Sequence, residues 1–151
     1  MNIIEALKND NLTIATAESV TAGLVANEIC NISGASDVFK GGIVSYTKQS
    51  KCMLLGLNMT DIEAYGVYSE ETVLAMAKGV KNKLSVDVAI ATSGVAGPFS
   101  DEGVDAGTVY FCFIVKDKIF IECKFFTGDR NTVRASAAKY AVDKVAQICS
   151  E

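Results

Sequence analysis

The amino-acid sequence predicts an α/β fold: a three-layer α/β/α sandwich around a mixed β-sheet, with residues 1–151 forming a single domain. Strands alternate with helices early in the chain, which is typical of parallel strands joined by helical crossovers. The nearly continuous apolar run VDVAIAT at 86–92 predicts a central strand that is covered on both faces. Two strands separated only by Lys116 and Asp117 predict an antiparallel hairpin near the end of the chain.

The first half of the chain supplies helices and strands in alternation. Apolar residues recur at helical spacing within 2–8 and again within 21–30, so both segments are expected to be amphipathic helices. Between them, the run LTIATA at 12–17 is typical of a buried strand. Turn residues then lead into the remaining elements of this half, a strand at 43–47 and a short helix at 49–55.

The second half begins with a capped helix and ends with a longer one. Ser69 precedes two glutamates, which places a capping hydroxyl and acidic groups at the positive end of a helix that continues to residue 84. The hairpin strands are expected at 107–115 and 118–126, and alternating apolar and polar residues in the second favour an edge strand. The last helix is expected at 131–148. Its apolar stripe comprises Val133, Ala137, Ala141, Val145 and Ile148.

The composition excludes several classes of site. The sequence contains no histidine, which excludes every catalytic triad or metal site that depends on imidazole. Its net charge is −4 and it has no basic run, so we expect no direct nucleic-acid partner. Five dispersed cysteines without a C-x-x-C pair indicate reduced thiols in a cytoplasmic protein, and no metal is expected. No segment has the pattern of a signal peptide or a membrane span, so we expect no membrane partner.

Three loops are expected where strands hand over to helices, the edge at which α/β sheets bind ligands: 18–21, 93–98 and 127–130. In the first of them, the segment AESVTAG leaves a strand and opens a helix. Ser19 therefore lies near backbone N–H groups that can hold a phosphate or an oxyanion. The alternative interpretation is that Ser19 or Thr21 caps the helix.

A lysine is the obvious base for a serine nucleophile in a chain without histidine. The segment GGIVSYTKQSK offers Lys48 and Lys51, together with Tyr46. To act as a base the lysine must be neutral, and lowering its pKa from about 10.4 to about 7.5 costs about 4 kcal/mol, so only a sheltered lysine qualifies. Lys48 either lowers the pKa of Lys51 or competes with it as the base. The alternative is a solvated lysine on a surface helix.

Two further segments are candidates for ligand binding. TSGVAGP at 92–98 forms a tight loop whose amides can approach a ligand closely, although a plain turn has the same composition. GDRNTVR at 128–134 opens the last helix, where Arg130 and Arg134 lie on the same side and can bind an anion. Alternatively, Asp129 caps this helix and both arginines are solvated.

A series of motifs occurs in one order along nearly the whole chain: AESVTAG, GGIVSYTKQSKCMLLG, YSEETVLAMAKG, TSGVAGP, AGTVYF and FFTGDRNTVR. This series resembles the CinA C-terminal domain family, which includes the nicotinamide mononucleotide amidohydrolases. The resemblance implies an α/β/α fold and a C–N hydrolase of pyridine-nucleotide salvage. Such an enzyme converts nicotinamide mononucleotide and water to nicotinic acid mononucleotide and ammonia, without a metal or other cofactor.

The resemblance also assigns roles to residues. It implies that Ser19 is the nucleophile, that Tyr46 and Lys51 complete the catalytic group, and that Arg130 contacts the substrate phosphate. Together with the residues themselves, it makes Lys51 the neutral base, Tyr46 a proton relay or orienting group, and the amides of 19–23 the oxyanion donors. The expected substrate-binding residues are Thr21, Gly23, Gly42, Ser93, Gly94, Gly97, Arg130 and Arg134.

The chain departs from the family pattern at several positions. Val20 and Ala22 replace a cysteine and a glycine of the first motif. Residues 99–103 replace a glycine-rich stretch after Pro98, and this loop is expected to shape the mouth of the pocket. These departures leave an alternative function, a catalytically silent nucleotide-binding or protein-interaction module of the same fold. The apolar hairpin and the exposed side of its second strand make a homo-oligomer the expected state of the chain.

Overall fold

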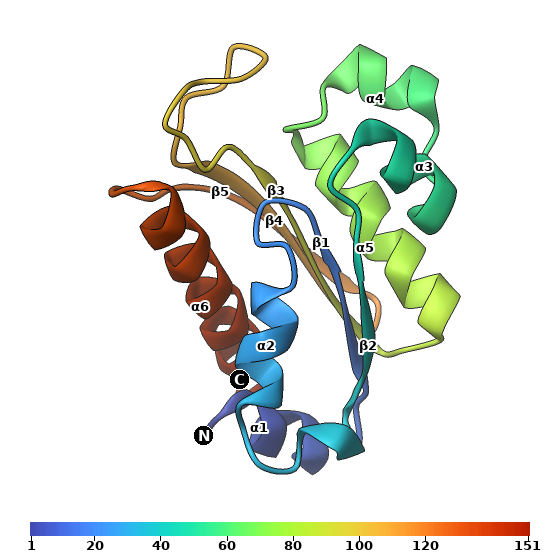
Figure 1. The fold of residues 1–151 in the computed structure, drawn as a ribbon. Helices are drawn as coiled ribbons and strands as arrows, with labels where there is room; N and C mark the ends of the chain where they lie inside the picture. Colours follow the sequence, from blue (N-terminus) through green and yellow to red (C-terminus); the bar gives the residue numbers. More distant parts are fainter.

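The computed structural model describes residues 1–151 (Figure 1). Five strands form one sheet in the order β2-β1-β3-β4-β5, and six α-helices and one 3-10 helix connect them. In chain order the elements are α1 (Ile3–Asn9), β1 (Ile14–Glu18), α2 (Leu24–Cys30), the 3-10 helix η1 (Ala35–Asp37), β2 (Phe39–Val44), α3 (Lys48–Leu55), α4 (Met59–Tyr65), α5 (Glu70–Leu84), β3 (Val88–Gly94), β4 (Thr108–Val115), β5 (Lys118–Phe125) and α6 (Arg130–Cys149).

The predicted three-layer α/β/α sandwich with a mixed sheet is confirmed. Strand β1 pairs in parallel with β2 on one side and with β3 on the other, whereas β3, β4 and β5 pair antiparallel. Helices α1, α2 and α6 cover one face of the sheet, and α3, α4 and α5 cover the other (Figure 1). Strand β5 lies at the edge, as its alternating sequence predicts.

Side-chain size differs between the two faces of the central strands. On β3, Val88 and Ile90 point into the core beneath α2 and α6, while Ala89 and Ala91 point into the core beneath α5. Alternation along a strand sends successive side chains to opposite faces, so the alanines let α5 pack closely against the sheet. All four side chains are fully buried.

The predicted bounds of the second strand, 43–47, are wrong, because β2 begins at Phe39 and ends at Val44. Gly41 and Gly42 suggest a turn in the sequence, yet they pair with β1 in parallel register. A Cβ on Gly42 would lie 2.4 Å from Thr16 Oγ1, so this glycine is required by close packing between the strands. Ser45 and Tyr46 consequently lie beyond the end of the strand.

Two helices also differ from the sequence predictions. Helix α2 begins at Leu24 rather than at residue 21, because Ala22 and Gly23 adopt left-handed φ angles of 46° and 98°. Helix α4 was not predicted, and its N-cap Asn58 accepts hydrogen bonds from the backbone N–H groups of Thr60 and Asp61. No helix of the chain is long and apolar enough to cross a membrane.

Candidate active site

The carboxyl ends of β1, β2 and β3 meet at one edge of the sheet. The parallel registers place Glu18, the last residue of β1, beside Val44 of β2 and Thr92 of β3. Ser19 directly follows β1. Lys51 lies in the first turns of α3, which begins shortly after β2. Parallel pairing therefore brings residues from distant segments to the edge at which α/β sheets bind ligands.

Ser19 and Lys51 form a buried pair at this edge. Lys51 Nζ lies 2.9 Å from Ser19 Oγ, and it donates a hydrogen bond of 2.8 Å to the backbone carbonyl of Ser45. The exposed fraction is 1% for Lys51 and 6% for Ser19. The backbone carbonyl of Ser45 thus fixes the direction from which the amine approaches the hydroxyl.

Burial lowers the pKa of Lys51 from its ordinary value to about 8. The cause is the loss of hydration of the ammonium form, and no carboxylate lies within ion-pair distance to restore that form. About a tenth of the amine is then neutral at pH 7. A neutral amine within hydrogen-bond distance of a hydroxyl can accept its proton.

Lys48 lies only one turn from Lys51, but its amine is paired with carboxylates. Its Nζ forms an ion pair of 2.7 Å with Glu102 and a longer one of 3.7 Å with Glu63. The hydrogen bond to Glu102 raises the pKa of Lys48 above its ordinary value. At a pH between the pKa values of the two lysines, Lys48 is protonated and Lys51 is neutral. Lys51 is therefore the stronger candidate for the base.

The start of α2 is occupied by an anion of the protein itself. The buried Glu18 carboxylate accepts hydrogen bonds from the backbone N–H groups of Gly23, Val25 and Ala26, at 2.8–3.1 Å, and from the hydroxyl of Thr21 at 2.7 Å. No Ser or Thr side chain caps this helix. Thr21 and Gly23, expected to contact the substrate, therefore bind Glu18 inside the protein.

The amides of the turn after Ser19 are not equally free. The N–H of Ser19 donates to the carbonyl of Thr92 at 3.1 Å, and the N–H of Ala22 donates to the carbonyl of Ser19 at 3.0 Å. The N–H groups of Val20 and Thr21 have no hydrogen-bond acceptor in the protein. Of these two residues only Val20 lines the pocket at Ser19, so its N–H is the free donor next to the nucleophile candidate.

Arg134 acts on the backbone of the same turn. Its Nε donates to the carbonyl of Val20 at 2.9 Å, and its Nη2 donates to the carbonyl of Thr21 at 3.4 Å. These two hydrogen bonds occupy its guanidinium. Arg134 was expected to bind the substrate, but it does not line the pocket. It ties α6 to the segment that carries Ser19.

Two other expected binding residues also lie outside the pocket lining. Ser93 is fully buried, and its hydroxyl donates to the carbonyl of Val67 at 2.9 Å. Gly42 packs against Thr16 between β1 and β2. Both residues therefore make contacts inside the protein and do not face the pocket.

The Ser19–Lys51 pair opens into a pocket of about 230 Å³. Of the expected binding residues, Gly94, Gly97 and Arg130 line it, as does Tyr46. The full lining is Ser19, Val20, Tyr46, Lys51, Val67, Tyr68, Gly94, Val95, Ala96, Gly97, Phe99, Asp101 and Arg130.

Arg130 links two walls of this pocket. Its Nη1 donates to the carbonyl of Gly97 at 2.7 Å, and its Nη2 donates to the hydroxyl of Tyr46 at 2.8 Å. Tyr46 is 53% exposed and makes no hydrogen bond to Ser19 or Lys51. The structure thus brings Tyr46 to Arg130 and not to the reacting pair.

Sequence reasoning did not find Tyr68 and Asp101 as pocket residues. The hydroxyl of Tyr68 donates to Asp101 Oδ2 at 2.7 Å, and both residues line the pocket together with Phe99. Residues 99–103 were expected to shape the mouth of the pocket, but Asp101 was not singled out among them. Tyr68 carries no sequence signal, since it lies in an ordinary segment just before α5.

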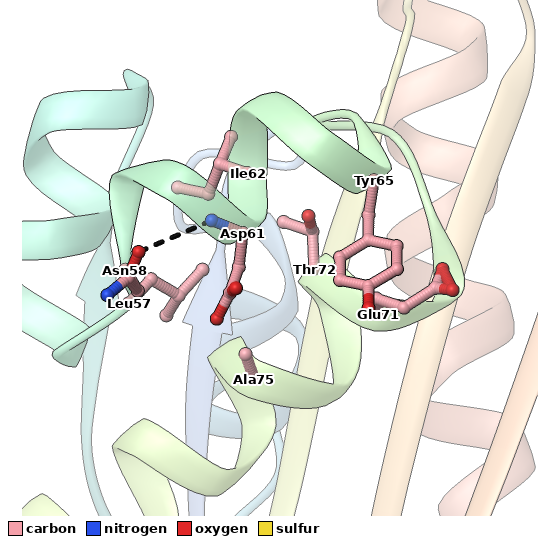
Figure 2. A pocket seen from close by; sticks show the side chains of 8 residues that line it. All are labelled: Leu57, Asn58, Asp61, Ile62, Tyr65, Glu71, Thr72 and Ala75. Carbon is pink, nitrogen blue, oxygen red and sulfur yellow. Dashed lines mark hydrogen bonds between the residues drawn. The ribbon is translucent and has the colours of Figure 1, made fainter.

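A second hollow, of about 100 Å³, lies between α4 and α5 (Figure 2). Two of its polar side chains bond within the protein: Asn58 caps α4, and the hydroxyl of Thr72 donates to the carbonyl of Gly66. No lysine or arginine lines it. The chain also has no group of three or more Cys, Asp or Glu side chains arranged to hold a metal ion. The chemistry-bearing residues therefore gather in the pocket at Ser19.

Known proteins resemble this chain over nearly its full length. The sequence profile of the CinA C-terminal domain matches residues 1–149. Protein MG115 homolog of Mycoplasma pneumoniae is 43% identical over 150 residues, which covers 99% of this chain and 96% of the relative. A CinA-like protein of Petrotoga mobilis is 37% identical over 142 residues, and this match covers 93% of the chain but 35% of the relative.

Solved structures agree with these matches. A CinA superfamily protein from Klebsiella pneumoniae has a TM-score of 0.95 at 30% identity, covering 98% of this chain and 93% of its own. One from Escherichia coli has a TM-score of 0.92 at 33% identity, covering 95% and 84%. The profile match, the sequence identities and the shared fold point the same way: the chain belongs to the CinA C-terminal domain family.

Proposed function

We propose that this chain is an amidohydrolase that converts nicotinamide mononucleotide and water to nicotinic acid mononucleotide and ammonia. The observation that carries the proposal is the buried contact of 2.9 Å between Ser19 Oγ and Lys51 Nζ. A serine hydroxyl is a weak nucleophile until a base removes its proton, and a lysine of lowered pKa supplies that base where histidine is absent.

The first half of the reaction forms an acyl-enzyme. Ser19 Oγ attacks the carboxamide carbon while neutral Lys51 accepts the hydroxyl proton. The N–H of Val20, free of any acceptor in the protein, stabilises the oxyanion of the tetrahedral intermediate. The protonated Lys51 then gives its proton to the amide nitrogen. The C–N bond breaks, and ammonia leaves.

The second half regenerates the enzyme. Water attacks the ester carbon as Lys51, neutral again, takes one of its protons. The ester bond to Ser19 breaks, the serine oxygen recovers its proton from Lys51, and the carboxylic acid is released. One water is consumed and one ammonia is formed, so the steps balance.

The pocket walls fit the rest of the substrate. Asp129 caps α6 by accepting a hydrogen bond of 2.8 Å from the N–H of Thr132, so the helix start already holds a carboxylate. The group suited to a phosphate is therefore the guanidinium of Arg130, whose Nη2 donates to Tyr46. In this proposal Tyr46 orients the Arg130 guanidinium, whereas the family resemblance makes it a proton relay or an orienting group beside Lys51. With the phosphate at Arg130, the carboxamide extends toward Ser19.

Ammonia release from nicotinamide mononucleotide tests this proposal. We expect Ser19→Ala to lower kcat by about a thousandfold and Lys51→Met by at least about a hundredfold, since each removes one partner of the reacting pair. Lys48→Met is the matched control, because it removes a lysine one turn away that is held by carboxylates. Its kcat should stay within about threefold of the wild-type value.

Two outcomes would contradict the proposal. Normal turnover by Ser19→Ala and Lys51→Met would exclude the mechanism. Binding of the nucleotide by the wild-type chain without ammonia release would favour the alternative, a silent nucleotide-binding module.

A further inference from the structure

Asp101 brings a carboxylate without a cationic partner to the pocket at Ser19. The side chain lines the pocket, and none of the ion pairs in the chain includes it. Arg130 lines the same pocket and carries the opposite charge. A ligand that fills this space therefore meets the Asp101 carboxylate as well as the Arg130 guanidinium and the Lys51 amine beside Ser19.

The Asp101 carboxylate is held in place by its surroundings. Asp101 and Val104 exchange two backbone hydrogen bonds, of 3.0 and 2.8 Å, which close a tight turn. The hydroxyl of Tyr68 donates to Oδ2 at 2.7 Å. Burial and the Asp101 charge both raise the pKa of Tyr68, so the phenol keeps its proton and continues to donate. The next residue, Glu102, is anchored to α3 through Lys48 at 2.7 Å.

Three aromatic rings line the pocket together with this carboxylate. Tyr46, Tyr68 and Phe99 line the same pocket. Phe99 is 82% exposed, which leaves its ring free to meet a ligand. Aromatic faces attract organic cations through the ring quadrupole, and a nearby carboxylate adds a direct charge interaction. This combination is suited to a flat cation and gives no comparable advantage to a neutral ring.

We infer that Asp101, positioned by Tyr68, is a specificity-determining residue that recognises the positive charge of the substrate's aromatic ring. The inference rests on the proposed function and names the part of the substrate that this wall selects: a pyridinium whose carboxamide reaches Ser19 and whose phosphate lies at Arg130. A nucleotide with an uncharged ring of the same shape is bound less well.

Binding to the Ser19→Ala chain tests the inference without turnover. Two ligands are compared: nicotinamide mononucleotide, whose ring is cationic, and its reduced form, whose dihydropyridine ring is neutral. Adding Asp101→Asn keeps an oxygen acceptor for Tyr68 but removes the charge. We expect Kd for the cationic ligand to rise about tenfold and Kd for the neutral ligand to change by less than about twofold.

The matched control is Asp105→Asn in the same background, because it removes an exposed carboxylate of the same loop that forms no ion pair and does not line the pocket. The Kd ratio of the two ligands should stay at its Ser19→Ala value in this variant. Equal weakening of both ligands by Asp101→Asn, or a ratio that changes equally in Asp105→Asn, would overturn the inference. Ammonia release by the wild-type chain, measured in parallel, decides the proposed function separately.

Discussion

At the scale of the residue, Lys51 is the most unusual group in the chain. Its side chain is 1% exposed, and its only hydrogen-bond partners are the hydroxyl of Ser19 and the carbonyl of Ser45. A buried ammonium without a carboxylate is costly, because hydration lost on folding is not replaced by an opposite charge. The amine therefore gives up its proton easily, which is what a base must do.

We expect Lys51→Met to stabilise the chain while abolishing turnover. The pKa of Lys51 is about 8 in the folded chain and 10.5 for a fully hydrated lysine, as in the unfolded chain, so the unfolded chain binds more protons between these values. The stability of the wild-type chain therefore rises with pH through this window. Below about pH 8 the cost of burial is fully present, at about 3 kcal/mol.

Urea unfolding of both chains at several pH values measures this effect. The advantage of Lys51→Met should be largest below about pH 8 and should shrink toward about pH 10.5. Loss of the hydrogen bonds from Lys51 to Ser45 and Ser19 reduces this gain at every pH. A stability difference that stays constant with pH would show that the Lys51 pKa is not lowered.

Residue types predicted part of the site and missed another part. Absence of histidine directs attention to lysine, and the strand-end position of Ser19 is visible in the sequence. The role of Glu18 could not be predicted, because its carboxylate reaches forward to Val25 and Ala26 after a turn with two left-handed residues. These hydrogen bonds depend on the path of the backbone between Glu18 and α2. The local conformational propensities of the residues do not determine that path.

At the scale of the element, α3 is the part whose position matters most, because it carries Lys51. Its C-terminal end packs against α5 at Gly79, where a Cβ would lie 2.3 Å from the carbonyl oxygen of Leu55. This glycine is in the interior of a helix, where alanine is normally preferred by about 1 kcal/mol. Close approach of the two helices outweighs that preference.

Gly79→Ala is therefore expected to destabilise the chain by about 1–3 kcal/mol, the opposite of its intrinsic effect in a helix. It should also lower kcat, since α3 must move away from α5 and carries Lys51 with it. Thermal unfolding and ammonia release measure the two effects. The Asn82→Ala change is a control for helix propensity, because Asn82 is an exposed residue inside α5. An unchanged or higher Tm for Gly79→Ala would contradict this account of the helix contact.

The elements themselves were predictable to different degrees. Helices α5 and α6 have long apolar stripes and clear caps, and both were predicted within a few residues. In contrast, the start of β2 and the whole of α4 were not predicted. Glycines that serve inter-strand packing look like turn residues, and α4 buries only Ile62, so its sequence shows no apolar stripe.

At the scale of the whole molecule, β5 leaves one edge of the sheet unpaired. Ile119 and Phe125 on this strand are 46% and 64% exposed. An exposed apolar edge favours pairing with another chain, so the expected homo-oligomer remains a prediction. Sedimentation equilibrium of the wild-type chain should give a mass above 16.0 kDa, and Ile119→Lys should lower it. A mass of 16.0 kDa at all concentrations would exclude association.

The central claim is that neutral Lys51 activates Ser19, and covalent labelling tests it most directly, without reference to any substrate. A fluorophosphonate reacts with an activated serine hydroxyl and releases fluoride, and intact mass with peptide mapping identifies the modified residue. The labelling rate of Ser19 should rise with pH through about 8, and Lys51→Met should remain unlabelled. A rate that does not change with pH, or equal labelling of Lys51→Met, would contradict the claim.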